Sequence, residues 1–330
     1  MLQTSCRWSI IDWPRPQTNH KRPKMYKIGE LSDPMMADLI VQDLTQKGIA
    51  SKLVEEQGLL AIYVEKENDR EKAFDMFRVR LGFAPRYEIP EEFKKMASIP
   101  WGTMTPVFIA LSLAISFAML TTGGKDVASL WFFSQEETQL FEEIKSGQWW
   151  RLWSPIFLHF GLLHIIFNML VFKDFGPLIE HQHGLKRALI WIAAIALFSN
   201  VAQYLVQGPQ FGGMSGVLFG MLGIIWTYKV FNPESEFSLP KSSVTMLLVW
   251  FFMCLFGLIP NIANTAHAVG LTVGMLIGIF LGENDRKISD AKDNIPFTKR
   301  FLFILLAIGL SLLTLAVEAW KLDGKLFFYA

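Results

Sequence analysis

Residues 208–226 read GPQFGGMSGVLFGMLGIIW, and the rest of the chain is organised around them. The first glycines cannot lie comfortably inside a helix, whereas the apolar run from Val217 onward can form one. The stretch therefore predicts a loop that turns into a helix, with Ser215 at or beside the N-cap. Backbone N–H groups gather at a helix start and stabilise developing negative charge, which favours a nucleophilic hydroxyl there. A serine at this place also has simpler uses, as a cap or as a small residue for close helix packing.

Composition places this stretch in a membrane protein. The 330 residues are 52% hydrophobic and 18% charged, and the charge is dense up to Lys95 and between Glu283 and Arg300. Between these regions, several apolar runs have the length needed to span a bilayer. The net charge of +1 is no argument for a nucleic-acid partner, and Cys6 and Cys254 suggest neither a disulfide framework nor a metal site. We expect an all-α polytopic membrane protein with a small α+β N-terminal domain.

The region before the spans is predicted to contain one small domain. Residues 1–24 are rich in proline and polar residues, and we expect a disordered extension. Residues 25–90 alternate strand and helix patterns, which predicts a β-α-β-β-α unit, and Phe83–Ser98 is expected to be a linker. The expected strands are Tyr26–Leu31, Ile49–Glu56 and Leu59–Glu65, and the expected helices begin at Ser32-Asp33-Pro34 and Asn68-Asp69 and end at Gly48 and Gly82.

Seven spans are predicted after residue 100. Six of them form a core over residues 100–282, and a charged linker and an additional helix occupy residues 283–330. A long polar and aromatic loop, Thr121–Trp150, separates the first two spans. Basic residues near the span ends place the N-terminal domain in the cytoplasm, so that spans two, four and six run from outside to inside. The spans are Met104–Leu120, Leu152–Phe172, Ala188–Val206, Ser215–Phe231, Val244–Ile259, Ala266–Leu281 and Phe301–Ala319.

Spans two, four and six carry polar residues near their outer ends. Span two holds His159, His164 and Asn168, span four begins at Ser215, and span six begins beside His267. Ionisable residues in a membrane are costly and usually face a bundle interior or a water-filled cavity. Spans four and six are predicted to cover roughly 25 Å, short of the ~30 Å hydrocarbon core, so their outer ends should be sunk in such a cavity.

These side chains supply the parts of an acyl-transfer site. Ser215 needs a base, and His267 could take its proton. The backbone N–H of Ser215, the Asn168 amide and the His164 ring could stabilise an oxyanion. No acidic residue lies at the same depth, so we expect a Ser–His dyad. Each histidine alone could be a hydrogen-bonded packing residue, but the whole set at one depth favours catalysis.

The motifs together resemble the rhomboid family of intramembrane serine proteases, and the small N-terminal domain makes the chain most similar to the bacterial GlpG type. The residues that carry the resemblance are Trp150-Arg151, His159, His164, Asn168, Gly213-Met214-Ser215-Gly216, Ala266-His267 and Gly270. The resemblance implies Ser215 as nucleophile, His267 as general base, and an oxyanion hole made by His164, Asn168 and Ser215. It also implies transmembrane protein substrates, cleavage near the outer membrane face, the bacterial inner membrane as location, and no cofactor or metal.

Further residues are expected to support this site. Gly270 and Gly274 begin a four-residue glycine repeat that should pack span six against span four. The resemblance implies that Trp150 and Arg151 help to fold the long loop. Phe219 stands where the GlpG type commonly has a tyrosine that stacks on the catalytic histidine, so the ring is kept and the hydroxyl is lost. The seventh span is a second departure from that type.

Two other functions remain open at this point. A non-catalytic rhomboid-like protein would bind transmembrane helices without cutting them. Such inactive relatives typically lack the serine or the histidine, whereas this chain has both Ser215 and His267. A transporter would need in-membrane acids and broken helices in repeated halves, and neither is clear in the sequence. We expect the lipid bilayer and transmembrane proteins as partners, with Phe167 and Trp250 on spans two and five as candidates for a moving element.

Overall fold

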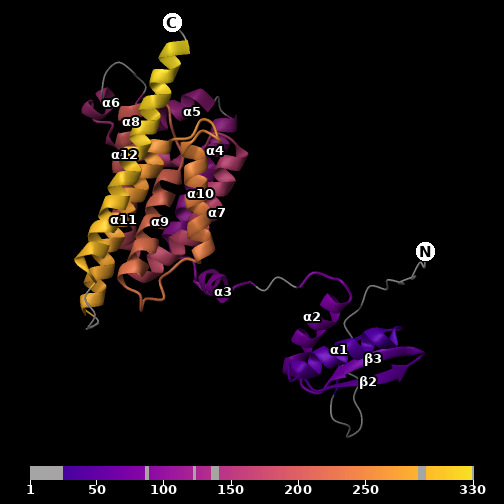
Figure 1. The fold of residues 1–330 in the computed structure, drawn as a ribbon. Helices are drawn as coiled ribbons and strands as arrows, with labels where there is room; N and C mark the ends of the chain where they lie inside the picture. Colours follow the sequence, from indigo (N-terminus) through magenta and orange to yellow (C-terminus); the bar gives the residue numbers. More distant parts are fainter. Residues whose placement is uncertain (1–24, 86–88, 122–123, 135–140, 289–294, 329–330) are drawn as a thin grey trace. The chain divides into compact units, whose positions relative to one another are not determined.

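The structure is a computed structural model that describes residues 25–85, 89–121, 124–134, 141–288 and 295–328. The predicted disordered extension over residues 1–24 lies outside the described residues. The chain divides into two compact units, Met1–Glu88 and Ile89–Ala330, each with its own hydrophobic core. The first unit contains a small sheet, whereas the described part of the second is built from helices (Figure 1).

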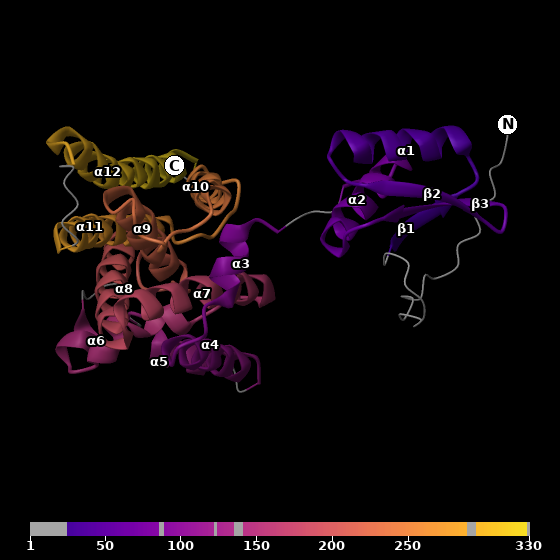
Figure 2. The same cartoon turned by 90° about the horizontal axis from the view of Figure 1, so that it is seen from below.

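The second unit is a bundle of helices that surrounds α9. Figure 2 shows this arrangement in a view along the helix axes. Apolar side chains on α7, α8, α9 and α11 form most of its core. α4 and α12 lie at opposite sides of the bundle in both views (Figures 1 and 2). The longer helices are α4 (Met104–Thr121), α7 (Leu162–His183), α8 (Leu185–Gln207), α9 (Ser215–Phe231), α10 (Lys241–Leu255), α11 (Asn264–Ile288) and α12 (Phe297–Phe328).

Helix length and composition agree with a membrane bundle. Among the described residues, five helices are long and apolar enough to cross a membrane, namely α4, α7, α8, α11 and α12. α9 and α10 are apolar but shorter, at 17 and 15 residues. The predicted short fourth span is therefore found with its predicted bounds. The sixth is not short, because α11 continues to Ile288 and has 25 residues.

The second predicted span is wrong at both ends. Leu152–Phe172 was expected, but α7 begins at Leu162 and runs to His183. Residues 154–157 form a 3-10 turn that contains Pro155, and Gly161 with φ 109° marks the start of the helix. The helix continues past the predicted end through the two charged residues Lys173 and Asp174.

Two expected connections contain helices. The expected linker over residues 83–98 contains α3 (Glu91–Ser98), and the long loop contains α5 (Gly124–Trp131) and α6 (Glu142–Lys145). α3 and α5 each have eight residues, too few for a clear helical period to emerge in the sequence.

A seam of glycines joins α9 and α11, the most extensively packed pair of helices. A Cβ at Gly270 or Gly274 would overlap the carbonyl oxygen of Gly216 or Gly220. Glycine in these places lets the two backbones approach as closely as small residues allow. The Thr227 hydroxyl bridges the seam, because its Oγ1 lies 2.7 and 2.9 Å from the carbonyl oxygens of Gly223 and Met275 and its single proton is shared between them. The predicted packing of the glycine stripe on span four is confirmed.

The additional C-terminal helix, α12, packs along α11. Thr272 on α11 donates to the Ala307 carbonyl and lies 2.8 Å from Ser311 Oγ, while Arg300 pairs with Glu283 at 2.5 Å. α12 is thus held to the core by polar contacts in addition to apolar packing.

The first unit forms the predicted β-α-β-β-α arrangement. Its strands β1 (Tyr26–Leu31), β2 (Ser51–Glu56) and β3 (Leu59–Val64) make an antiparallel sheet in the order β1-β3-β2. Asp33 caps α1 (Pro34–Gln46) by accepting from the N–H groups of Met35 and Met36. Gln57 and Gly58 both have positive φ, as a two-residue hairpin between β2 and β3 requires.

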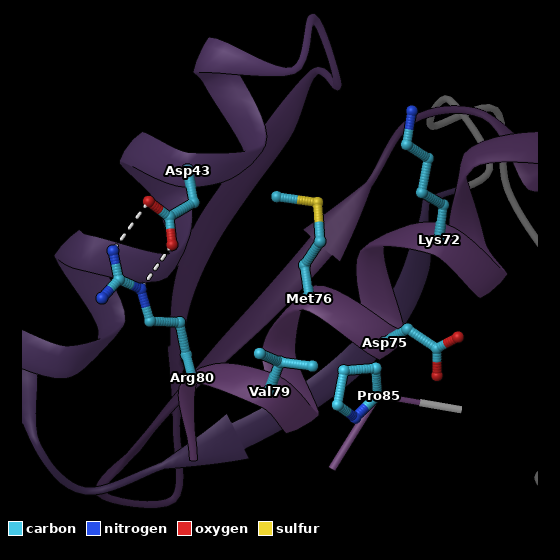
Figure 3. Close-up of a pocket in the computed structure, with 7 residues that line it drawn as sticks. All are labelled: Asp43, Lys72, Asp75, Met76, Val79, Arg80 and Pro85. Atoms are coloured by element: carbon cyan, nitrogen blue, oxygen red, sulfur yellow. Dashed lines mark hydrogen bonds and ion pairs between the residues drawn. The ribbon is translucent and has the colours of Figure 1, made fainter. Parts of the chain in front are cut away.

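The helices of this unit cover the sheet with their apolar sides. Ile40 and Leu44 on α1 and Phe77 on α2 (Arg70–Arg80) join Ile62 and Val64 in the core. An ion pair between Arg80 and Asp43 links the two helices at the surface, beside a hollow lined by Met76 and Val79 (Figure 3).

Candidate active site

Ser215 is the first residue of α9, as the sequence predicts. The loop before it is fixed by the Gly213 N–H, which donates to the Pro155 carbonyl at 3.0 Å. Gly213 has φ +122°, a conformation that favours glycine. The first intrahelical bond runs from the Leu218 N–H to the Met214 carbonyl. The N–H of Ser215 therefore has no acceptor within its own helix and is available at the positive end of the helix dipole.

His267 lies in the first turn of α11, opposite Ser215. Its Nε2 is 2.7 Å from Ser215 Oγ, a normal hydrogen-bond distance, and its ring is 3% exposed. Its Nδ1 is buried with no hydrogen-bond partner among the described residues. A neutral ring with its proton on Nδ1 can accept the serine proton at Nε2. No carboxylate in the described part of the chain accepts a hydrogen bond from Nδ1.

Phe219 packs against the His267 ring. The two ring centroids are 4.7 Å apart with planes inclined at 41°. Phe251 from α10 packs against the Phe219 ring, with the centroids 5.7 Å apart. Because Phe219 is one turn after Ser215 on α9, the contact fixes the histidine ring relative to the helix that carries the serine. The ring contact expected at this position is present without a hydroxyl.

His164 Nε2 faces the space above Gly213. The Phe160 N–H approaches His164 Nδ1 at 3.4 Å, which makes Nδ1 the acceptor and puts the ring proton on Nε2. A Cβ added to Gly213 would lie 2.6 Å from His164 Nε2 and 3.8 Å from Ser215 Oγ. The volume that this glycine leaves free therefore borders both a nitrogen donor and the serine hydroxyl.

Asn168 and His159 lie beside His164 but differ in what they offer. Asn168 is one turn after His164 on α7, and its Nδ2 donates to the His164 carbonyl at 2.8 Å, which leaves its second N–H to donate elsewhere. His159 precedes α7, so the expectation that it belongs to the second span is wrong. Its Nδ1 lies 3.1 Å from the Phe157 carbonyl, and its ring packs on His164 at 5.0 Å.

Trp150 and Arg151 are not close partners of the serine and histidine but anchor the long loop. The Arg151 guanidinium is buried, and its Nη1 donates to the carbonyls of Ser129 and Phe132 at 2.8 and 2.7 Å. Trp150 Nε1 donates to the Leu130 carbonyl at 3.2 Å. Both side chains thus tie the turn at residues 149–152 to the end of α5.

Polar residues on α8 that the sequence motifs do not include lie behind the site. Ser199 Oγ would lie 3.2 Å from a Cβ on Gly216, and Gln203 Oε1 accepts from the Ala266 N–H at 3.0 Å. Both side chains are buried. Their spacing of four residues inside an apolar run is a signal that could have revealed a polar stripe facing the site.

Comparison with known proteins shows the family of the chain. The family model described as Rhomboid domain matches residues 146–284, which include all of the residues discussed above except those in the loop before residue 146. The protein named Rhomboid protease GlpG from Yersinia pestis (strain Pestoides F) is 33% identical over 187 residues, 56% of this chain and 65% of that protein. The protein of the same name from Pectobacterium atrosepticum is 32% identical over 196 residues, 59% of this chain and 67% of that protein. The chain belongs to the rhomboid family.

Proposed function

We propose that the protein is a serine endopeptidase that cuts transmembrane proteins within the bilayer. The observation that carries this proposal is the 2.7 Å contact between His267 Nε2 and Ser215 Oγ, made between two helix ends in a buried place. A serine hydroxyl becomes an effective nucleophile when a base is held within hydrogen-bond distance. The relatives named Rhomboid protease GlpG support the same activity, although the alignment covers 65% of the Yersinia protein.

In the proposed reaction, His267 removes the serine proton as Ser215 Oγ attacks the scissile carbonyl carbon. The protonated ring then gives that proton to the leaving amine, and the C–N bond breaks to leave an acyl-enzyme. A water molecule, deprotonated by the same ring, hydrolyses the ester and returns the hydroxyl to Ser215. No metal or cofactor takes part in this sequence.

The oxyanion is proposed to bind in the free space above Gly213. His164 Nε2–H and the Ser215 hydroxyl border that space. The Ser215 N–H has no acceptor within its helix, and Asn168 has one N–H left to donate. Removing one such donor typically costs about 10²–10³ in rate. We therefore expect Asn168→Ala to lower kcat by no more than that, since the other two donors remain.

The proposed substrates are single transmembrane segments, and the proposed location is the bacterial inner membrane with the N-terminal unit in the cytoplasm. The basic residues that set this orientation lie near span ends, among them Lys186 and Arg187 at the start of α8 and Arg300 near the start of α12. In this orientation Ser215 and His267 lie toward the outer face of the membrane, and cleavage takes place near that face.

A covalent probe and a cleavage assay test the proposal together. The protein purified in detergent should react with a fluorophosphonate and cut a single-span model substrate, and both reactions should be lost in Ser215→Ala and His267→Ala. Ser112→Ala, which removes a buried hydroxyl from α4, is the matched control and should retain both. Cleavage by purified Ser215→Ala would refute the mechanism. Substrate binding with neither labelling nor cleavage in the unaltered protein would instead support the non-catalytic reading.

A further inference from the structure

A buried carboxylate on the additional helix is connected to the first turn of α11. Glu318 is 5% exposed and lies on α12. Its Oε1 accepts from Asn264 Nδ2 at 3.0 Å and from Lys321 Nζ at 2.8 Å, and its Oε2 accepts from Gln207 Nε2 at 2.5 Å. Its place near the end of an apolar run predicts a side chain that reaches the membrane interface, whereas the fold buries it among partners from three helices.

The hydrogen bonds continue from Glu318 toward the catalytic histidine. Gln207 Oε1 accepts from Gln203 Nε2 at 2.6 Å, and Gln203 Oε1 accepts from the Ala266 N–H at 3.0 Å. The first intrahelical bond of α11 runs from the His267 N–H to the Ala263 carbonyl, so Ala266 is in the first turn and its N–H has no acceptor within the helix. Two glutamines thus join the carboxylate to the residue just before His267.

The carboxylate determines the direction of this relay. An ionised carboxylate can only accept, so Gln207 must present its NH₂ group to Glu318 and its oxygen to Gln203. Gln203 must then present its oxygen to the Ala266 N–H. If Glu318 becomes an amide and turns its NH₂ group toward Gln207, each glutamine can reverse, and the last reversal points an NH₂ group at Ala266. Gln207 is the exposed last residue of α8, so Glu318 is what orients it.

We propose that Glu318 is a positioning residue that holds the first turn of α11, and with it His267, in register with Ser215. This inference rests on the proposed function. Glu318 acts along two routes, directly through Asn264 at the start of α11 and indirectly through the glutamine relay to Ala266. Lys321 compensates the carboxylate charge, which would be costly to bury alone. The additional C-terminal helix, α12, thereby takes part in shaping a site to which it contributes no reacting group.

An exchange of side chains tests the relay. In the double variant Gln207→Glu and Glu318→Gln, the new carboxylate accepts from Gln203 and from the new amide, whose oxygen accepts from Asn264. Every donor then regains an acceptor and Gln203 keeps its original direction. The new carboxylate also occupies an exposed position, where it is hydrated. The matched control is Ser311→Ala, which removes a different polar contact between α12 and α11.

The measurements are kcat and KM with a single-span substrate, the fraction of active enzyme from fluorophosphonate labelling, and the melting temperature. Per active enzyme, Glu318→Gln should lower kcat about ten- to a hundredfold with little change in KM, as a small misplacement of a catalytic group does. The double variant should recover most of kcat, and Ser311→Ala should retain it. Unchanged kcat in folded Glu318→Gln, an equal loss in Ser311→Ala, or a folded double variant without recovery would each overturn the inference.

Two further outcomes keep the test decisive. If Glu318→Gln does not fold, recovery of folding and kcat in the double variant supports the relay, and failure of both overturns it. If the unaltered enzyme neither cleaves nor labels, or Ser215→Ala still cleaves, the proposed function fails. That failure is recognised in the unaltered protein and Ser215→Ala, independently of any variant at Glu318.

Discussion

Replacing Gly270 by alanine should separate the two helices that carry the serine and the histidine. The added Cβ would overlap the Gly216 carbonyl oxygen and lie 2.9 Å from its carbonyl carbon, and neither backbone atom can move without its helix. Ordinary carbon contacts begin at about 3.5 Å, so the carbon contact alone requires α11 to shift by about 0.6 Å, and the overlap with the oxygen requires more. A shift of about 0.6 Å along the line between Ser215 and His267 would already lengthen their 2.7 Å contact to about 3.3 Å, beyond the usual range of about 2.7–3.2 Å for a hydrogen bond between nitrogen and oxygen.

The expected result is a loss of both activity and stability. We expect kcat to fall on the order of a hundredfold, the cost of misplacing catalytic groups by about an ångström, and stability to fall by about 1–3 kcal/mol from overpacking. Gly309→Ala is the control, because Gly309 lies in α12 and a Cβ there meets nothing within 4 Å. That control gains the same helix propensity, about 0.5–1 kcal/mol, without a clash. The assays are substrate cleavage and thermal unfolding in detergent. Gly270→Ala with the kcat and melting temperature of the Gly309→Ala control would refute the reasoning.

Three other predictions concern parts of the chain outside the catalytic seam. Deleting residues 1–88 should leave cleavage in detergent largely intact, because every proposed catalytic group lies in the second unit, and complete loss in a folded truncated enzyme would contradict this. A reporter fused at Ala330 should be active only if it is of a kind that works outside the cytoplasm, since α12 is predicted to cross to the outer side. Activity of a reporter that works only in the cytoplasm would contradict this topology. The Arg80 guanidinium holds the pKa of the Asp43 carboxyl below its ordinary value of 3.8. The pair therefore stabilises the N-terminal unit above that pH, and the stabilisation disappears as the pH falls through the lower folded-state pKa. Arg80→Ala should raise the Asp43 pKa in an NMR titration, and an unchanged value would show that the ion pair in Figure 3 is not formed in solution.

The sequence predicts the start of α9 and the glycine seam because both depend on local features. Glycines followed by an apolar run define a loop and a helix start, and a four-residue glycine repeat defines one face of a helix. The contact between Ser215 and His267, 52 positions apart, could be expected for a different reason. Both residues are predicted to lie at the outer ends of spans that run in the same direction, and the family resemblance implies the same pair.

The errors have physical causes that hydropathy does not record. Residues 152–158 are apolar because they are buried in a folded loop, so they look like the beginning of a span although Pro155 and Gly161 prevent a continuous helix. Glu318 looks like an interfacial charge because it is near the end of an apolar run. Its burial depends on Gln207 and Asn264, which are brought to it only by tertiary packing.

The backbone contact between α9 and α11 has a mechanical consequence. Glycines on both helices leave no side-chain layer between them, so this pair lacks the compliance that rotating side chains give to other helix interfaces. The neighbouring helix α10 has only three buried residues among its 15, Phe251, Cys254 and Leu255, so side chains rather than backbone make its contacts with the bundle. A displacement of α10 would therefore leave the spacing between Ser215 and His267, the proposed nucleophile and base, unchanged.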